Sequence, residues 1–339
     1  MRRIRNLASM SYSRDVEIEV NVAFDTRNKK RSPVRWAEMG LVSLYLVRHW
    51  KMLQPSVLIL SLPRSGSSWV GEILGSSSDA LYLREPLTQS AMAIDDSQPT
   101  EMYIDPLNAP QFYKHFADTA FAGLPMFPRF IVRYPEQWIL SKRRQRRLVV
   151  KEVNLLACDW LVQCYRPRII LLLRHPAAVA LSYFKIGWIN INIQKMFFSH
   201  ERLINGPLKK WQDCLKPRVS GFWAKHGVLQ GAVLRFAADS LNRYPEHKII
   251  LYEDLCSRPM DIFQELFAFA NLRWNERIEK FIRDKSKNGD RGQFYTTTRN
   301  SKKMIDVWKG KIPEDNLHDL KETYGAFDLP WYRSSSDWQ

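Results

Sequence analysis

Residues 61–74, SLPRSGSSWVGEIL, gather several phosphate-binding side chains in a short stretch. Arg64 carries a fixed positive charge on a fork of N–H groups. Gly66 allows a tight turn and a close approach of the backbone to an anion. The serines beside it add hydroxyl donors: Ser65, Ser67 and Ser68. These residue types at this spacing predict a phosphate site, or, as the simpler alternative, a serine-rich turn that caps a helix.

The sequence around this stretch favours the phosphate site. An apolar run, SVLIL, precedes it, and a helix-like pattern follows it. In a strand–turn–helix unit the first backbone amides of the helix point at a bound anion. The stretch lacks the first glycine and the lysine of the ATP-binding loop G-x-x-x-x-G-K-[ST]. A kinase of the P-loop type is therefore an alternative with less support, because no carboxylate for Mg²⁺ is evident either.

A second stretch, RIILLLRHPAAVALSYF at 168–184, repeats the arrangement. Arg174 follows an apolar run, and Pro176 suits the first turn of a helix. Ser182 lies about two turns into that helix, so both side chains can converge on one phosphate. The alternative is that Arg174 pairs with a surface carboxylate. Together, in this order and about 110 residues apart, the two stretches are a specific signal of phosphate binding.

At these residues the sequence resembles the sulfotransferases that use 3′-phosphoadenosine 5′-phosphosulfate (PAPS). PRSGSSW resembles their 5′-phosphosulfate loop, and RHPAAVALS resembles their 3′-phosphate signature. Four further segments are similar to parts of the family, and the likeness spans roughly residues 55 to 332. They are LYLREPL (81–87), LVVKEVNLL (148–156), ILYEDLCSRPMDIFQELFAFANL (250–272) and WKGKIPEDNLHDL (308–320).

The sequence departs from the family pattern at three positions. Arg64 stands where the cytosolic small-molecule enzymes carry lysine, which places the chain nearer the carbohydrate and protein-tyrosine branch. His175 replaces the usual aspartate and Ala177 the usual arginine. These two changes remove a charge pair, and they leave the phosphate contacts of Arg174 and Ser182 in place.

The resemblance implies a role for each residue of the two stretches. Sulfuryl transfer should pass through a loose, in-line transition state like that of phosphoryl transfer. Arg64, with the amides of residues 65–69 behind it, would stabilise charge on the leaving oxygen without a metal. Arg174 and Ser182 would hold the 3′-phosphate that distinguishes PAPS from ATP. Two aromatic residues are expected near the nucleotide or, alternatively, in the core: Trp69 and Tyr252.

The acceptor hydroxyl needs a base, and Glu85 is the candidate that the resemblance implies. The alternative is that Glu85 forms an ordinary surface ion pair with its neighbour Arg84. Glu72 is a weaker candidate, because it lies on the predicted helix and not after a strand end. Lys151, at the end of its predicted strand, would contact the sulfuryl group or the acceptor.

Five short apolar runs would position these residues, and they are predicted strands. They are Val57–Leu60, Leu81–Leu83, Leu148–Val150, Ile169–Leu173 and Ile249–Tyr252. Helical patterns lie between or after them: Trp69–Leu74, Pro176–Ile186, Gly227–Leu241 and Met260–Phe269. Strands that are apolar on both faces and alternate with helices indicate an α/β fold. We expect a P-loop-like open parallel sheet of about four to five strands, flanked by helices and carrying helical insertions.

The chain is expected to form a single domain over residues 55–332. Residues 1–54 would be an N-terminal arm or edge element, and residues 333–339 a C-terminal tail. Two long segments, 88–145 and 183–226, interrupt the strand–helix pattern. Insertions at strand ends often build the substrate pocket, so both are expected to shape the acceptor site.

The charge of the chain indicates an anionic partner. Lys and Arg number 51 against 35 Asp and Glu, a formal net charge of +16. The basic run SKRRQRR ends at 147, and it is either a solvated face or a surface that attracts an acidic acceptor or phospholipid headgroups. A basic nucleic-acid-binding protein is the alternative class. Against it, the basic residues fall on no single helix, and the phosphate motifs fit a mononucleotide.

No residue pattern predicts a metal site, since neither the four cysteines nor the seven histidines are grouped like ligands. The N-terminus lacks the apolar core of a signal peptide, and the apolar stretch 39–47 is too short to span a bilayer. We therefore expect a cytoplasmic enzyme, with peripheral membrane contact through basic patches left open. The acceptor is expected to be a carbohydrate or glycolipid hydroxyl, because the insertions are rich in aromatic and basic residues. The sequence does not predict an oligomeric state.

Overall fold

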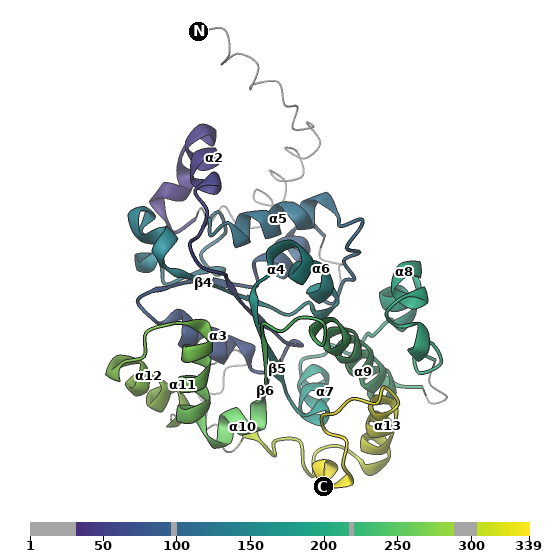
Figure 1. The fold of residues 1–339 in the computed structure, drawn as a ribbon. Coiled ribbons are helices and arrows are strands. Elements are labelled where there is room, and N and C mark those ends of the chain that lie inside the picture. Colours follow the sequence, from purple (N-terminus) through teal and green to yellow (C-terminus); the bar gives the residue numbers. More distant parts are fainter. Residues whose placement is uncertain (1–31, 96–99, 217–219, 288–303) are drawn as a thin grey trace.

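A six-stranded sheet forms the centre of the chain in the computed structural model, which describes residues 32–95, 100–216, 220–287 and 304–339 (Figure 1). Its strand order is β3-β2-β4-β1-β5-β6. The strands are β1 Val57–Leu60, β2 Ala80–Arg84, β3 Val132–Arg133, β4 Arg147–Glu152, β5 Arg168–Leu173 and β6 His247–Leu251. Every neighbouring pair is parallel except β2 and β3, which are antiparallel.

All five predicted strands are present, and the α/β fold is confirmed. The central strands are continuous apolar runs because helices cover both of their faces; every residue of β1 is fully buried. Two details differ from the sequence prediction. β3 adds a sixth strand, which is too short to give a periodic signal. Tyr252 begins helix α10 and is not the last residue of a strand.

Helices connect the strands and pack on the two faces of the sheet. The α-helices are α2 Leu41–His49, α3 Ser67–Gly75, α4 Pro86–Ile94, α5 Gln111–Phe121, α6 Cys158–Tyr165, α7 Pro176–Lys185, α8 Glu201–Asn205, α9 Phe222–Leu241, α10 Tyr252–Ser257, α11 Pro259–Ala270, α12 Glu276–Lys287 and α13 Glu314–Gly325. The short 3₁₀ and π turns are η2 Arg35–Glu38, η3 Pro135–Gln137, η4 Leu140–Gln145, η5 Leu155–Ala157, η6 Gln194–Phe198, η7 Lys209–Trp211 and η9 Ser335–Trp338.

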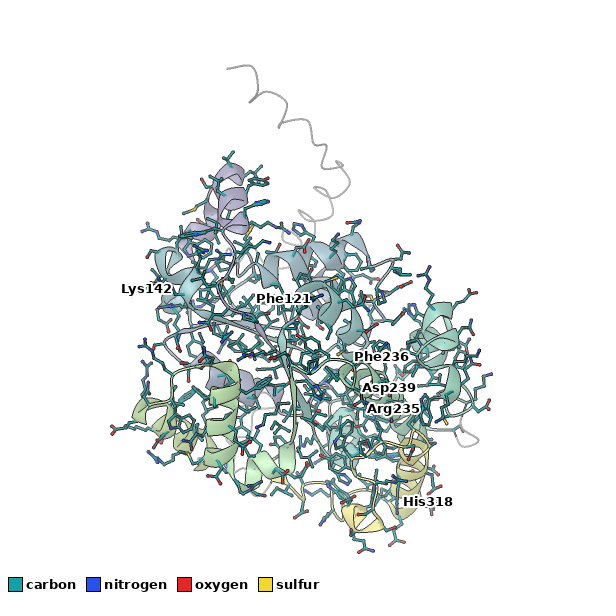
Figure 2. The ribbon with its side chains drawn as sticks, in the orientation of Figure 1. Phe121, Lys142, Arg235, Phe236, Asp239 and His318 are labelled. Carbon is teal, nitrogen blue, oxygen red and sulfur yellow. The ribbon has the colours of Figure 1, made fainter. Side chains whose placement is uncertain are left out.

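The sheet separates two hydrophobic cores, because side chains alternate between its faces. Leu58 and Leu60 join the core formed with α4 to α7, α9 and α13. Val57 and Ile59 join the core formed with α3 and α10 to α12. Side chains fill both layers, as Figure 2 shows, with Phe236 of α9 buried in the larger one.

Helix α2 and the C-terminal segment lie at opposite ends of the strands. α2 projects from the molecule near the amino ends of the strands (Figure 1). The C-terminal segment returns to the carboxyl ends, where Trp338 is buried against the His175 ring with centroids 4.8 Å apart. The boundaries at residues 54 and 332, and the role of the insertions, stay predictions.

Candidate active site

The first predicted phosphate loop connects β1 to α3. Gly66 has a φ of 94°, and a side chain there would place its Cβ 2.4 Å from Cε2 of Tyr252. Arg64 is also in the left-handed region, with a φ of 68°. A non-glycine residue in this region costs free energy and is common where a side chain is held for function. The turn is fastened to the helix start, since the Ser61 hydroxyl donates to Oγ of Ser67 at 2.7 Å.

The second predicted loop, between β5 and α7, contacts the first directly. Nη1 of Arg174 donates to the carbonyl of Arg64 at 2.9 Å. Nε of Arg64 donates to Oγ of Ser182, also at 2.9 Å. The Arg174 guanidinium lies 4.6 Å from the centre of the Tyr252 ring. The two loops meet because β1 and β5 are adjacent parallel strands whose carboxyl ends lie at one edge of the sheet.

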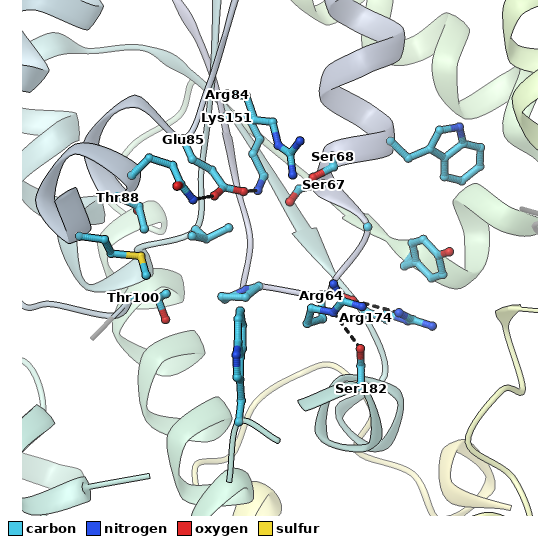
Figure 3. A pocket seen from close by; sticks show the side chains of 18 of the residues that line it. Arg64, Ser67, Ser68, Arg84, Glu85, Thr88, Thr100, Lys151, Arg174 and Ser182 are labelled. Carbon is cyan, nitrogen blue, oxygen red and sulfur yellow. Dashed lines mark hydrogen bonds and ion pairs between the residues drawn. The ribbon is translucent and has the colours of Figure 1, made fainter. Parts of the chain in front are cut away.

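A pocket of about 350 Å³ opens between these loops and the ends of β2 and β4 (Figure 3). The residues predicted from the sequence line it, except for Ser65, which is buried in the turn, and Glu72, the weaker candidate base. They are Arg64, Gly66, Ser67, Ser68, Trp69, Glu85, Lys151, Arg174, Ser182 and Tyr252. Trp69 also packs edge-on against Phe263, so it belongs to both the pocket wall and the core.

Glu85 pairs with Lys151 inside this pocket (Figure 3). The Lys151 ammonium bonds to Oε1 of Glu85, the Glu85 N–H donates to the Lys151 carbonyl at 2.6 Å, and Gln89 donates to Oε2 at 2.8 Å. The side chains are 13% exposed for Glu85 and 3% for Lys151. The alternative prediction, that Glu85 forms an ordinary surface ion pair with Arg84, is therefore wrong.

The environment of Glu85 keeps its carboxylate ionised. Burial acts to raise the pKa of Glu85, but the charge and hydrogen bond of Lys151 act the other way, with help from Gln89 and Arg84. The net effect holds the pKa of Glu85 below its ordinary value. An ionised carboxylate beside an ammonium can accept a proton from a hydroxyl bound between them.

Glu152, next along β4, supports this arrangement and was missed by the sequence prediction. Its carboxylate accepts the N–H groups of Leu87 at 2.6 Å and Thr88 at 3.3 Å, and the Thr88 hydroxyl at 2.7 Å. These groups belong to the first turn of α4, whose N-cap residue is Glu85. Burial raises the pKa of Glu152 to about 7.

Glu72, the weaker base candidate, does not line the pocket. It lies on α3 and accepts from Nε of Arg133 at 3.0 Å and from the Tyr134 hydroxyl at 3.0 Å. Its contacts tie α3 to the edge of the sheet.

His175 replaces the family's aspartate as a neutral cap. Its Nδ1 accepts the N–H of Ala177 at 3.2 Å at the start of α7, and its ring stacks on Trp308 at 4.4 Å. Burial lowers the pKa of His175 to about 4. A neutral side chain therefore caps the N-terminus of α7.

The basic run that ends at 147 is not a continuous exposed face. Arg143 is fully buried and donates to the carbonyls of Trp50 at 2.7 Å and Gly123 at 3.1 Å. Arg147 is also buried and donates to the carbonyl of Pro55 at 2.6 Å. The interpretation of the whole run as a solvated face is wrong, although Lys142 within it is exposed.

The pocket contains further residues that the sequence prediction missed. They are Pro63, Arg84, Thr88, Gln89, Met92, Thr100, Val153, Trp188 and Lys285. Several fall in the two segments expected to shape an acceptor site, but no local pattern marked them individually. In the part of the chain that the structure describes, no cluster of three His, Cys, Asp or Glu side chains could hold a metal. No helix in the described ranges has the length and apolar character to cross a bilayer. The expected cytoplasmic location stays a prediction.

Comparisons with known proteins assign the chain to a family. The family described as "Sulfotransferase domain" matches residues 54–326. Carbohydrate sulfotransferase 5 of Homo sapiens is 24% identical over 328 residues, covering 82% of this chain and 77% of that protein. Carbohydrate sulfotransferase 4 of Mus musculus is 21% identical over 327 residues, covering 81% of each.

Solved structures with some likeness also include sulfotransferases. The sulfotransferase domain from the curacin biosynthetic pathway has a TM-score of 0.46 and 16% identity, covering 82% of this chain and 99% of that one. Mouse sulfotransferase SULT7A1 complexed with PAP has a TM-score of 0.37 and 15% identity, covering 87% and 90%.

Proposed function

Because the chain belongs to the PAPS-dependent sulfotransferase family, and is an enzyme of that class, we propose that it transfers the sulfuryl group of PAPS to a hydroxyl of a carbohydrate or glycolipid. One observation carries the proposal. Both phosphate loops and the Glu85–Lys151 pair open into the same pocket, so one donor and one acceptor can meet there.

In this proposal the donor lies across the two loops. Arg174 and Ser182 bind the 3′-phosphate. The Ser182 hydroxyl accepts a hydrogen bond from Nε of Arg64, so its own O–H can donate to the phosphate. The helix start at Ser67 and Ser68 binds the 5′-phosphosulfate with its amides and hydroxyls. Tyr252 stacks on Arg174 and fixes the direction of the guanidinium.

The transfer itself uses the residues between the loops and β4. The acceptor oxygen attacks sulfur while the bond from sulfur to the bridging oxygen breaks, and the electron pair leaves with the 5′-phosphate of the nucleotide. Arg64 stabilises the charge on that phosphate; loss of one such donor typically raises a barrier by about 2.7–4 kcal/mol. The proton of the acceptor hydroxyl passes to the Glu85 carboxylate, and Lys151 holds the sulfuryl oxygens.

The proposed acceptor class rests on two supports. The relatives at 21% to 24% identity are named carbohydrate sulfotransferases. In addition, Met92, Val153 and Trp188 give the pocket an apolar wall beside its charged groups. Such a combination suits a sugar ring, which presents C–H faces to aromatic side chains and hydroxyls to polar ones.

Binding of 3′-phosphoadenosine 5′-phosphate (PAP) and of adenosine 5′-phosphate tests the donor site. The protein should bind PAP far more tightly, and Arg174→Ala should reduce that preference about 10- to 100-fold, because a hydrogen bond to a charged group contributes about 1.5–3 kcal/mol. Arg273→Ala, at an exposed arginine outside the pocket, is the matched control. Equal affinity of the wild type for the two nucleotides would refute the donor assignment.

Transfer from sulfur-labelled PAPS tests the acceptor. A set of oligosaccharides and glycolipids should include labelled products, and a panel of phenols and peptides should not. Labelling confined to phenols or tyrosine peptides would refute the carbohydrate assignment and leave the donor assignment standing.

A further inference from the structure

Exposed apolar side chains gather on one face of α2, far from the pocket. Leu41, Val42, Tyr45 and Leu46 are between 60% and 81% exposed. Residues at these spacings share one side of a helix. The opposite side of α2 carries Leu44 and Val47, which are buried against the rest of the molecule. Trp50 and Leu53 extend the exposed surface; these six exposed residues are called the α2 face.

The α2 face is held in place by the arginines of η4. The Arg143 guanidinium donates to the Trp50 carbonyl at the C-terminal end of α2, and Nε of Arg144 donates to the Lys51 carbonyl at 2.9 Å. Arg48 pairs with Asp118 of α5 at 3.3 Å. The fold therefore holds several exposed apolar side chains on one side of α2, and a group of such side chains marks an interaction site.

Cations outnumber acidic residues beside the α2 face, where Glu38 is an exposed carboxylate just before α2. Arg35, Lys51 and Lys142 are exposed, and Figure 2 shows Lys142 at the outer edge of the molecule on η4. The Arg144 guanidinium lies 5.2 Å from the centre of the Trp50 ring. Among the five basic residues between 139 and 147, Lys142 is exposed and Arg144 and Arg146 are half-buried, and this stretch contains no acidic residue. The surface is therefore complementary to an anionic partner.

The kinds of apolar residue also indicate the partner. Trp and Tyr are enriched where a protein meets the headgroup region of a bilayer, since their rings are apolar and their N–H or O–H groups stay hydrated. A short helix with an exposed apolar face and a basic border can lie in that region. α2 projects from the body of the protein (Figure 1), which suits a fluid surface better than a fixed protein groove.

We propose that the α2 face docks on an anionic membrane surface. Its apolar side chains insert at the boundary of headgroups and acyl chains, and the bordering cations contact lipid phosphates. α2 leads through residues 50–56 into the start of β1, so it lies at the amino ends of the parallel strands. The pocket lies at their carboxyl ends, and docking through α2 leaves it open to an acceptor.

Co-sedimentation of the full chain with vesicles tests the proposal. Vesicles of phosphatidylcholine mixed with phosphatidylglycerol should bind the protein, and salt should weaken the binding. The variant Leu41→Ser/Val42→Ser/Leu46→Ser should lower the partition coefficient about tenfold or more. Lys51→Ala/Lys142→Ala should reduce binding to the anionic vesicles and flatten the salt dependence.

Leu107→Ser is the matched control, because Leu107 is 81% exposed and lies near α8, where its neighbour Asp105 pairs with Arg202. All variants should keep the PAP affinity and unfolding midpoint of the wild type, which shows that they fold.

Three results would overturn the proposal. The wild type could fail to bind anionic vesicles. The triple serine variant could bind them as well as the wild type, which would assign binding to another segment. A dimer that the triple variant abolishes, without vesicle binding by the wild type, would assign the α2 face to a second copy of the chain.

Discussion

At the scale of single residues, the proposed chemistry depends on two opposing effects on the pKa of Glu85. Burial acts to raise the pKa of its carboxyl group, and Lys151 reverses that effect through its charge and hydrogen bond. The active form of a base is the ionised one, which is present above its pKa and lost as the pH falls through it. A lowered pKa therefore keeps Glu85 ready to accept a proton throughout the neutral range.

Replacing Lys151 should change the pH dependence of kcat/KM, because Lys151 lowers the pKa of Glu85. In Lys151→Met the burial of Glu85 is no longer countered, so its pKa should rise and the acidic limb of log kcat/KM should move to higher pH. Glu85→Gln should lower kcat about 10²- to 10⁴-fold at every pH, because it removes the base. The measurement is sulfuryl transfer from PAPS across the acid range.

Lys225→Met, at an exposed lysine of α9, controls for the loss of a positive charge and should leave the profile unchanged. If the acidic limb of Lys151→Met coincides with that of the wild type, Glu85 is not the group that titrates in catalysis.

At the scale of elements, the turn before α3 requires a glycine at 66 for two reasons. Its φ of 94° disfavours any side chain, at a cost of about 1–2 kcal/mol. A Cβ would also collide with the Tyr252 ring, which lies under Arg174. Gly66→Ala should therefore destabilise the protein by about 2 kcal/mol or more and weaken PAP binding.

Urea unfolding and PAP titration measure these effects. Gly40→Ala is a suitable control, because no atom lies within 4 Å of a Cβ there and φ is −59°. In a Tyr252→Ala background, Gly66→Ala should cost less stability than in the wild type, because the collision is absent and only the cost of φ remains. Stability of Gly66→Ala equal to that of the wild type would contradict the described turn.

The start of α4 depends on Glu152. In Glu152→Gln one of the accepting oxygens becomes an NH₂ group, which cannot accept the bonds of Leu87 or Thr88. The variant should lose about 1–3 kcal/mol of stability. Its kcat should fall, because Glu85 begins the displaced segment, whereas PAP affinity should hold, because Glu152 does not line the pocket.

Glu322→Gln, at an exposed position of α13, should change none of these quantities. A parallel loss of PAP affinity and kcat in Glu152→Gln would indicate general disruption of the site and would contradict a positioning role.

The sequence predicted elements better than the contacts between them. The strands were evident because both of their faces are buried, which leaves continuous apolar runs. The meeting of Arg64 with Ser182 depends on β1 and β5 being neighbours, and no local pattern contains that fact. Likewise, a run of five basic residues gives no sign that Arg143 points inward to three carbonyl groups.

At the scale of the whole molecule, the strand order accounts for the position of the site. β1 lies between β4 and β5: the chain passes from β1 to β2 on one side of it, and later from β4 to β5 on the other side. Ligands of open α/β sheets bind at such a reversal, beyond the carboxyl ends of the strands. The phosphate loops follow β1 and β5, and the Glu85–Lys151 pair comes from β2 and β4.

The stability of the whole domain should fall in mild acid because two buried histidines are neutral. Burial lowers the pKa of His175 to about 4 and that of His226 to about 3. The unfolded chain takes up these protons near pH 6.5, so it is favoured as the pH falls from about 6.5 towards 4. Glu152 opposes this trend, because its pKa is raised to about 7 and its contribution is lost as the pH rises through that value.

Glu101, whose pKa burial also raises, acts with Glu152, whereas His115 and His200, whose pKa values burial lowers, act with the two buried histidines. Because four histidines oppose two carboxyl groups, the net free energy of unfolding should be lower at pH 5 than at pH 7. In His175→Asn the side-chain oxygen can still accept from Ala177 at the start of α7, but no proton is taken up on unfolding. The variant should lose stability at both pH values, because it lacks the stack on Trp308, and the difference between them should shrink. Urea denaturation at the two pH values measures that difference, and an unchanged difference in His175→Asn would show that the pKa of His175 is the same in the folded and unfolded chain.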